Sequence, residues 1–279
     1  MNHDILLIII FSVFAVLILS LIIFLMMKKS LLRKKLANCI FPEKWKIFLF
    51  KNFAIYQYLP KDIKEKLHKK ISFFIHEKNF EGCGGLKIDV LHKIIIAANA
   101  CLPIVNSEND LYPYLQTIIL YPGVYKNNNL TAASENVLSE SEHVVAGESF
   151  SAGTIVLAWD VCLNDSQNLN TASNVIIHEF THQLDAENGP TDGIPAIFNR
   201  AKLNEWEQIF REEFANFRLK SFHKYDVIDQ YGSVNAAEFY AVCSEAFFDM
   251  PLLLEKQHPQ IYNVFQKFYN LDPASWFRN

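Results

Sequence analysis

Apolar and polar residues follow two different patterns along this chain, and the first pattern occupies the N-terminus. Residues 5–27 form a run of almost entirely apolar residues that contains no charged side chain. At ~1.5 Å of rise per residue, a helix of this length crosses the ~30 Å hydrocarbon core of a bilayer. The run therefore predicts a single transmembrane helix that anchors the protein in a membrane through residues 5–27.

Two other interpretations of this run agree less well with its length and its flanks. A secretory signal peptide has an apolar region of only ~7–15 residues, and its basic residues precede that region, whereas here they follow it. A buried core helix rarely runs so far without a polar face. The membrane anchor agrees with both the length of the run and the position of the charges.

The charged residues beside the run predict its orientation. Only His3 and Asp4 precede it, and the five basic residues that follow it are Lys28, Lys29, Arg33, Lys34 and Lys35. By the positive-inside bias, the N-terminus lies outside the cell membrane and everything from Lys28 onward is cytoplasmic. Residues 28–40 are predicted to form a basic juxtamembrane linker, whose charges can also lie against anionic headgroups.

The rest of the chain, 41–279, has the pattern of one α+β domain. Apolar residues recur every three to four positions in 59–80, which predicts a helix, and 89–105 is a second, more apolar helix. The expected strands are 117–122, 142–149 and 153–160, with a polar loop at 126–142. The next predicted helix has Ser173 or Asn174 as its N-cap. Further helices are expected at 199–218, 235–249 and 257–270. Strands followed by helices are typical of an α+β fold.

Composition and charge narrow the class of protein. The formal charge of −4 is too small and too mixed in sign to indicate nucleic-acid binding. The five cysteines are widely spaced and form no CxxC pair, which argues against a disulfide framework and against a cysteine-zinc site. Free thiols fit a reducing compartment, in agreement with the predicted cytoplasmic location.

The sequence HEFTH (178–182) has the residues and spacing of a metal-binding site. It places His178, Glu179 and His182 as H-E-x-x-H, and on a helix two histidines four apart share a face and can meet one metal ion. Glu179 lies to the side of that face, where it can reach a water but not the metal. The alternative is a pair of core histidines bonded to backbone carbonyls, but burying them beside a carboxylate is unfavourable without a compensating ion.

A catalytic zinc ion usually has a third protein ligand, which must come from another part of the chain. Glu238 and Glu245 lie seven apart on the predicted helix 235–249, so both face the same way among apolar residues. Asn235 followed three residues later by Glu238 is also a capping-box pattern, which would leave Glu245 as the ligand. The residues alone do not separate the two glutamates.

Four stretches of the chain together resemble one family. They are GTIVLAWD (153–160), IIHEFTHQLDAENG (176–189), DGIP (192–195) and YGSVNAAEFYAVCSEAFF (231–248). From residue 41 to 275 the chain resembles the Mlc titration factor A family of zinc metallopeptidases. The resemblance implies a zincin-like fold similar to the catalytic domain of lethal-factor proteases, and it does not extend to the N-terminal apolar run.

Transferred residue by residue, the resemblance also implies the ligands of the metal. One zinc ion per chain is bound by His178, His182 and Glu238. Glu245 then orients a ligand histidine or fixes its helix.

The resemblance implies further roles around the metal. Tyr231 would donate a hydrogen bond to the oxyanion that forms on the substrate carbonyl, the alternative being an ordinary half-buried tyrosine. Asp185 either reaches a ligand imidazole or holds local structure. In zincins the substrate lies as an added strand at a sheet edge, and 153–160 is the strand expected at that edge.

These observations predict a membrane-tethered zinc peptidase with a peptide or protein substrate, in which Glu179 is the general base. The family implies aminopeptidase-like activity, although no residue here distinguishes removal of terminal residues from internal cleavage. The main alternative is a binding protein that sequesters a transcriptional repressor at the membrane, and such a protein needs no general base at Glu179. An intramembrane protease disagrees with the sequence because the HExxH helix lies far from the apolar run.

Overall fold

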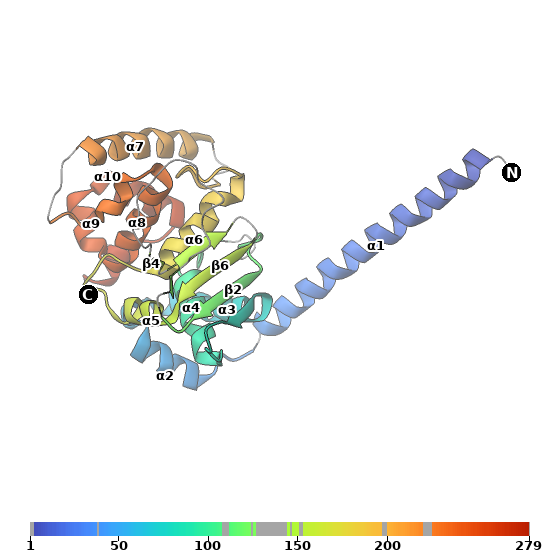
Figure 1. The fold of residues 1–279 in the computed structure, drawn as a ribbon, viewed down its shortest axis with the longest axis horizontal. Coiled ribbons are helices and arrows are strands. Elements are labelled where there is room, and N and C mark those ends of the chain that lie inside the picture. The colour runs from blue at the N-terminus through green and yellow to red at the C-terminus, as the bar shows by residue number, and fades with distance from the viewer. Residues whose placement is uncertain are drawn as a thin grey trace. The chain divides into compact units, whose positions relative to one another are not determined.

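The computed structural model describes residues 3–37, 39–107, 112–123, 125–126, 144–145, 147–150, 153–196, 200–219 and 225–278. Most of the predicted loop 126–142 lies outside these residues. The chain divides into two compact units, Met1–Phe41 and Pro42–Asn279 (Figure 1).

The first unit consists of one long helix, α1 (His3–Ala37), which continues through most of the predicted linker 28–40. Within the described part of the chain, no helix is long and apolar enough to cross a membrane. The transmembrane helix predicted for residues 5–27 is therefore not found among the described residues.

The second unit contains a four-stranded sheet in the order β1-β2-β6-β5, with β1 (Asn79–Gly82), β2 (Thr117–Tyr121), β6 (Thr154–Ala158) and β5 (Gly147–Phe150). The strands β1, β2 and β6 are parallel, and β5 pairs antiparallel with β6. Strand β6 is an inner strand, as its buried side chains on both faces indicate. The prediction that 153–160 forms the sheet edge is wrong, because β5 pairs with its outer side. A separate pair is formed by β3 (Tyr125–Lys126) and β4 (Val144–Val145).

The rest of the second unit is mainly helical. The helices before the HExxH motif are α2 (Glu43–Asn52), η1 (Ala54–Gln57), α3 (Lys61–Glu77), α4 (Val90–Cys101) and α5 (Trp159–Gln167). The motif helix is α6 (Val175–Asp185), followed by η2 (Ala186–Asn188). The C-terminal helices are α7 (Arg200–Leu219), η3 (Gln230–Ser233), α8 (Ala236–Asp249), α9 (Pro251–Gln257), α10 (Pro259–Tyr269) and α11 (Pro273–Trp276).

The predicted helices are present, as are the strands predicted at 117–122 and 153–160. The predicted strand 142–149 is not one strand, because β4 and β5 belong to different sheets. The apolar positions of α3 that recur every three to four residues are the ones that it buries: Ile63, Leu67, Ile71 and Phe74. Sequence periodicity did not identify β1, α2, α5, α9 and α11, most of which are short. The fold class α+β is confirmed.

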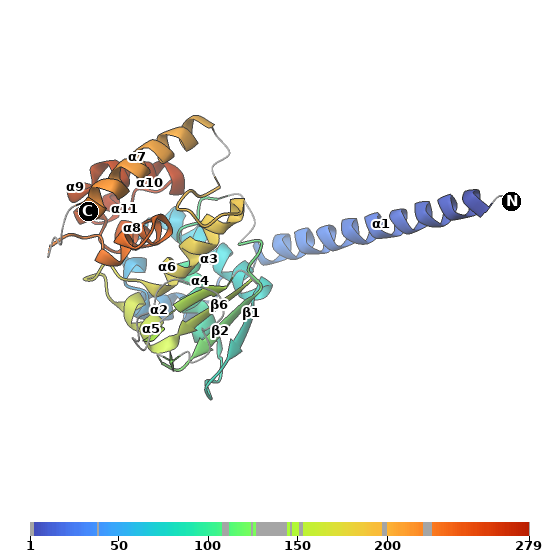
Figure 2. The same ribbon diagram turned by 45° about the horizontal axis from the view of Figure 1, so that its top comes forward.

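The motif helix α6 lies between the sheet and the C-terminal helices in both views of the domain (Figures 1 and 2). On the far side from the sheet it packs against α8, which is buried along nearly its whole length. Aromatic side chains of neighbouring helices cover α8: the ring centroid of its Tyr240 lies 5.4 Å from that of Trp206 of α7 and 5.7 Å from that of Phe265 of α10. Two separate parts of the chain, α6 and α8, are thus fixed face to face.

Candidate metal centre

Helix α6 begins where a polar side chain can hold its first turn. The Asn174 side chain accepts a hydrogen bond from the backbone nitrogen of Ile177 at 3.2 Å, which makes Asn174 the N-cap. Of the two predicted capping residues, the structure therefore uses Asn174. The helix turns its apolar side chains into the core and presents His178 and His182, one turn apart, to α8.

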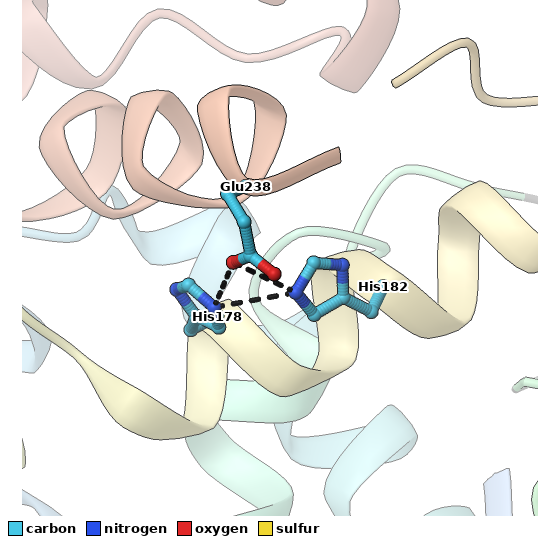
Figure 3. Close-up of side chains that lie close together, drawn as sticks. All are labelled: His178, His182 and Glu238. Atoms are coloured by element: carbon cyan, nitrogen blue, oxygen red, sulfur yellow. Dashed lines mark hydrogen bonds and ion pairs between the residues drawn. The ribbon is translucent and has the colours of Figure 1, made fainter. Parts of the chain in front are cut away.

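Three donor atoms from α6 and α8 converge on one point (Figure 3). Glu238 Oε2 lies 3.0 Å from His178 Nε2 and 3.4 Å from His182 Nε2, and the two nitrogens are 3.2 Å apart. In a tetrahedral zinc site with bonds of ~2.0–2.1 Å, the ligand atoms are ~3.3 Å from one another. The three atoms are therefore spaced as three corners of such a site, and these residues fit the metal that the sequence predicts.

Electrostatics at this point also favour a bound cation. Burial alone would lower the pKa of His178, but its hydrogen bonds to Glu238 and Glu245 raise that pKa to about 10. Burial alone would raise the pKa of Glu238, but hydrogen bonds to His178 and His182 lower it to about 2. Positive charge beside the Glu238 carboxylate is therefore stabilised here, which favours the binding of a metal cation.

The structure separates the two glutamates that spacing alone could not. Asn235 caps α8 by accepting from the backbone nitrogen of Glu238 at 2.9 Å, and the Glu238 carboxylate points instead at the histidines. The Glu245 carboxylate meets the opposite side of the ring, with its Oε1 2.7 Å from His178 Nδ1. Glu238 therefore lies where a ligand would lie, and Glu245 lies where it can orient His178.

Glu179 is buried close to the donor atoms without being one of them. Only 6% of its surface is exposed. Burial raises the pKa of its carboxyl to about 7, against the opposing effect of the His178 and His182 charges. A carboxyl with a pKa near neutrality is suited to accept and return a proton.

Tyr231 lies at the mouth of the same site. Its ring centroid is 6.1 Å from that of His178, and 53% of its surface is exposed. It belongs to η3, and the side chain of the N-cap residue Asp229 accepts from the Tyr231 backbone nitrogen at 2.7 Å. Burial raises the pKa of its hydroxyl, so this group stays protonated and can donate a hydrogen bond.

The contacts of Asp185 fit the second of its two predicted roles, which is to hold local structure. Both of its carboxylate oxygens accept from the Gly193 backbone nitrogen, at 2.8 and 3.1 Å, which fixes the DGIP turn to the end of α6. The buried Nδ1 atom of His182 has no hydrogen-bond partner in the described part of the chain, so Asp185 does not orient that ring.

A group of buried polar residues that was not predicted from the sequence lies behind His178 and includes Asn99, Asp165 and Asp249. The only signal of these residues in the sequence is a polar side chain inside an apolar helix, such as Asn99 in IIIAANAC.

The family that this chain matches is one of metallo-peptidases, in agreement with a metal site at His178, His182 and Glu238. The family model for the glucose-regulated metallo-peptidase M90 matches residues 27–270. The uncharacterized protein slr2042 of Synechocystis sp. is 34% identical over 86% of this chain and 88% of its own. Mlc titration factor A of Klebsiella pneumoniae (strain 342) is 27% identical, over 77% of this chain and 82% of its own. The Mlc titration factor A of Escherichia fergusonii is 29% identical, over 74% of this chain and 78% of its own. With nearly the whole chain matched, this protein belongs to the M90 family of glucose-regulated metallo-peptidases.

Proposed function

We propose that this protein is a zinc-dependent peptidase with one zinc ion per chain, held by His178, His182 and Glu238. The observation that carries the proposal is the spacing of their three donor atoms, 3.0, 3.2 and 3.4 Å apart. A set of two imidazoles and one carboxylate is typical of catalytic zinc and leaves a position open. When bound, zinc polarises a water molecule and the substrate carbonyl.

The side chains around this site supply the proton transfers. The Glu179 carboxylate accepts a proton from the attacking water and later delivers it to the leaving amine. The Tyr231 hydroxyl donates a hydrogen bond to the oxygen of the attacked carbonyl as negative charge develops there. Glu245 accepts from His178 Nδ1 and so leaves Nε2 of that ring free for the metal.

The substrate of this reaction is a peptide or a protein. Strand β5 is the outermost described strand beside β6, and α6 packs against it. An extended peptide that pairs with the outer edge of β5 would be held by backbone hydrogen bonds, which gives broad sequence tolerance. Aminopeptidase activity belongs to this proposal, and it is tested with matched peptides whose N-termini are free or acetylated.

The decisive experiment measures zinc content and peptide cleavage on the same samples. Wild type is expected to hold one zinc ion per chain and to cleave a mixed peptide library. Glu238→Ala and His178→Ala are expected to lose both zinc and cleavage, whereas Glu179→Gln keeps zinc and loses cleavage. Zinc retained in Glu238→Ala would move the ligand elsewhere, and cleavage retained in Glu179→Gln would contradict the assigned base.

The name of the relatives, Mlc titration factor A, points to a regulatory protein as a partner of those proteins. The same variant tests whether binding alone accounts for the function here. A protein that only sequesters a regulator keeps its full function after Glu179→Gln, whereas a peptidase loses it.

The location at the cell membrane, with the N-terminus outside and the catalytic domain cytoplasmic, stays a prediction from the sequence. It is supported by large exposed apolar side chains on α1, such as Phe11 (70% exposed) and Val16 (64%). Apolar surface of this extent is normally covered by lipid or by another protein. Fractionation of cells expressing the full chain tests the location, and recovery of the protein in the aqueous fraction would contradict it.

A further inference from the structure

A cluster of polar side chains lies in the core behind His178, on the side away from Glu238. Its members come from four helices or their caps and are 0–6% exposed: Asn99, Asp165, Ser166, Asn174, Glu245 and Asp249. Burying polar groups is unfavourable unless each finds a hydrogen-bond partner. The cluster therefore has to be explained by the bonds that it makes.

A continuous chain of hydrogen bonds runs through the cluster and ends at His178. The ring donates from Nδ1 to Glu245 Oε1 at 2.7 Å, and Glu245 Oε2 accepts from the Asn174 backbone nitrogen at 2.5 Å. The Asn174 side chain donates to Asn99 Oδ1 at 3.0 Å, and the Asn99 amide donates to Ser166 Oγ at 2.8 Å. Helices α4 and α5 are thus connected to a residue of the candidate metal centre.

Asn174 is the junction of this chain, and it uses every polar group that it has. Its side-chain oxygen caps α6, and its carbonyl accepts from the His178 backbone nitrogen at 2.9 Å. Its backbone nitrogen holds Glu245, and its amide group holds Asn99. Serine, threonine and aspartate are also good N-caps, but only asparagine adds an amide donor to the capping oxygen.

We propose that Asn174, held in place by Asn99, is a positioning residue that fixes the Glu245 carboxylate and through it the orientation of His178 at the metal site. The proposal rests on the proposed zinc site. A ligand imidazole whose second nitrogen is held by a carboxylate has a fixed tautomer and a fixed ring direction, and loss of such support typically weakens metal binding 10–100-fold. Asn174 extends that support by one step, from the carboxylate to the backbone that holds it.

The charges near Asn174 explain why a neutral amide is needed there. Burial, with the nearby Glu245 charge, raises the pKa of Asp249 well above its usual value, and burial raises that of Asp165. An ionised carboxylate at position 174 could not replace the Asn174 amide as donor to Asn99 Oδ1, and it would lose the hydrogen bond between the Asn174 side chain and Asp249. Asn99 cannot simply reverse its amide, because its nitrogen already donates to Ile95 O at 3.0 Å and to Ser166.

The test uses Asn174→Asp, which keeps the size of the side chain and the helix cap but replaces the amide donor by an acceptor. Zinc affinity is measured by competition with a chromophoric chelator, at a temperature where circular dichroism shows each full-length variant folded. We expect Asn174→Asp to bind zinc 10–100-fold more weakly than wild type. The matched control is Asp89→Asn, the same exchange in reverse at the exposed N-cap of α4, for which zinc affinity should stay within twofold of wild type.

A second variant and a double variant separate positioning from folding. Asn99→Leu removes the acceptor of the Asn174 amide, and Asn99 itself bonds neither Glu245 nor His178. This variant should also weaken zinc binding, and it serves as the test if Asn174→Asp fails to fold. If Asn174 acts through Glu245, the two losses overlap, so Asn174→Asp should change zinc affinity less than threefold in a Glu245→Gln background. The visible spectrum of the Co²⁺-loaded variants should shift with the ligand geometry.

Each outcome has a definite meaning. Wild-type zinc affinity in a folded Asn174→Asp or Asn99→Leu protein would overturn the positioning role while leaving the proposed peptidase intact. Fully additive losses in the double variant would overturn the path through Glu245. Absence of zinc binding in wild type would refute the proposed function and this inference together.

Discussion

Replacing Gly193 with alanine tests how strictly the packing around α8 places Glu238. Gly193 has φ +80, and a Cβ there would lie 2.6 Å from the carbonyl oxygen of Ala236, the first residue of α8. Ordinary contact begins at 3.4 Å, so the turn and the helix must separate by roughly 0.8 Å. Ala236 lies two residues before Glu238, and the displacement therefore reaches the metal centre.

The size of the effect has two parts. An alanine at positive φ costs ~1–2 kcal/mol of folding stability, and overpacking a rigid site adds ~1–3 kcal/mol. Gly193→Ala is therefore expected to lose ~2–5 kcal/mol in urea unfolding of the zinc-free protein. Because functional constellations tolerate displacements of only ~0.5 Å, zinc affinity should also fall roughly tenfold or more.

Gly85 supplies a control in which the backbone strain is present without the clash. Its φ is +84, and an added Cβ would meet nothing within 4 Å. Gly85→Ala is expected to lose only the ~1–2 kcal/mol of the strained backbone and to bind zinc like wild type. If the two variants unfold at the same urea concentration and bind zinc equally, the contact between the DGIP turn and α8 does not position Glu238.

Three further outcomes are expected. Glu179→Gln should keep zinc and lose ~10²–10⁴-fold in kcat/KM. Peptide cleavage and metal content are measured on the same sample, and a smaller loss would contradict the role of Glu179 as the general base. The pKa of His178 is raised from 6.5 to about 10, so protonated His178 should stabilise the zinc-free protein fully below pH 6.5. This stabilisation should be lost as the pH rises towards 10, and a urea midpoint that stays constant over that range would contradict the raised pKa of His178. Trp206→Phe removes the indole N–H that donates to the Gly193 carbonyl at 3.0 Å, and the free energy of unfolding should fall by ~1–3 kcal/mol. An unchanged free energy of unfolding would show that this hydrogen bond does not contribute to stability.

Local periodicity was sufficient to predict the helices that have one buried face. The apolar positions of α3 follow the 3.6-residue repeat, and the buried stripe can be read directly from the sequence. The two histidines of α6 were predictable for the same reason, since residues four apart share a face. The family resemblance identified by four motifs is confirmed, as is the α+β class.

Strand order and the choice between two glutamates depend on packing that local pattern does not contain. Strand β6 is apolar on both faces, which shows that it is buried but not which strands lie beside it, so its inner position was not predicted. Glu238 and Glu245 share one face of α8, and only the height at which α8 crosses α6 decides which of them meets Nε2 of His178. The amide of Asn174 could not be separated from an ordinary helix cap without its partner Asn99.

The packing of α8 among the C-terminal helices also has a consequence for the order of synthesis. Glu238 follows His178 by 60 residues, and α8 is covered by aromatic residues of α10 such as Phe265 and Tyr269, which leave the ribosome later still. At ~5–20 residues per second, several seconds pass between synthesis of the histidines and synthesis of the carboxylate that completes the site. A nascent chain therefore carries the HExxH helix before the proposed metal site is complete, and the site can form only after α8 and the covering helix α10 have been synthesised.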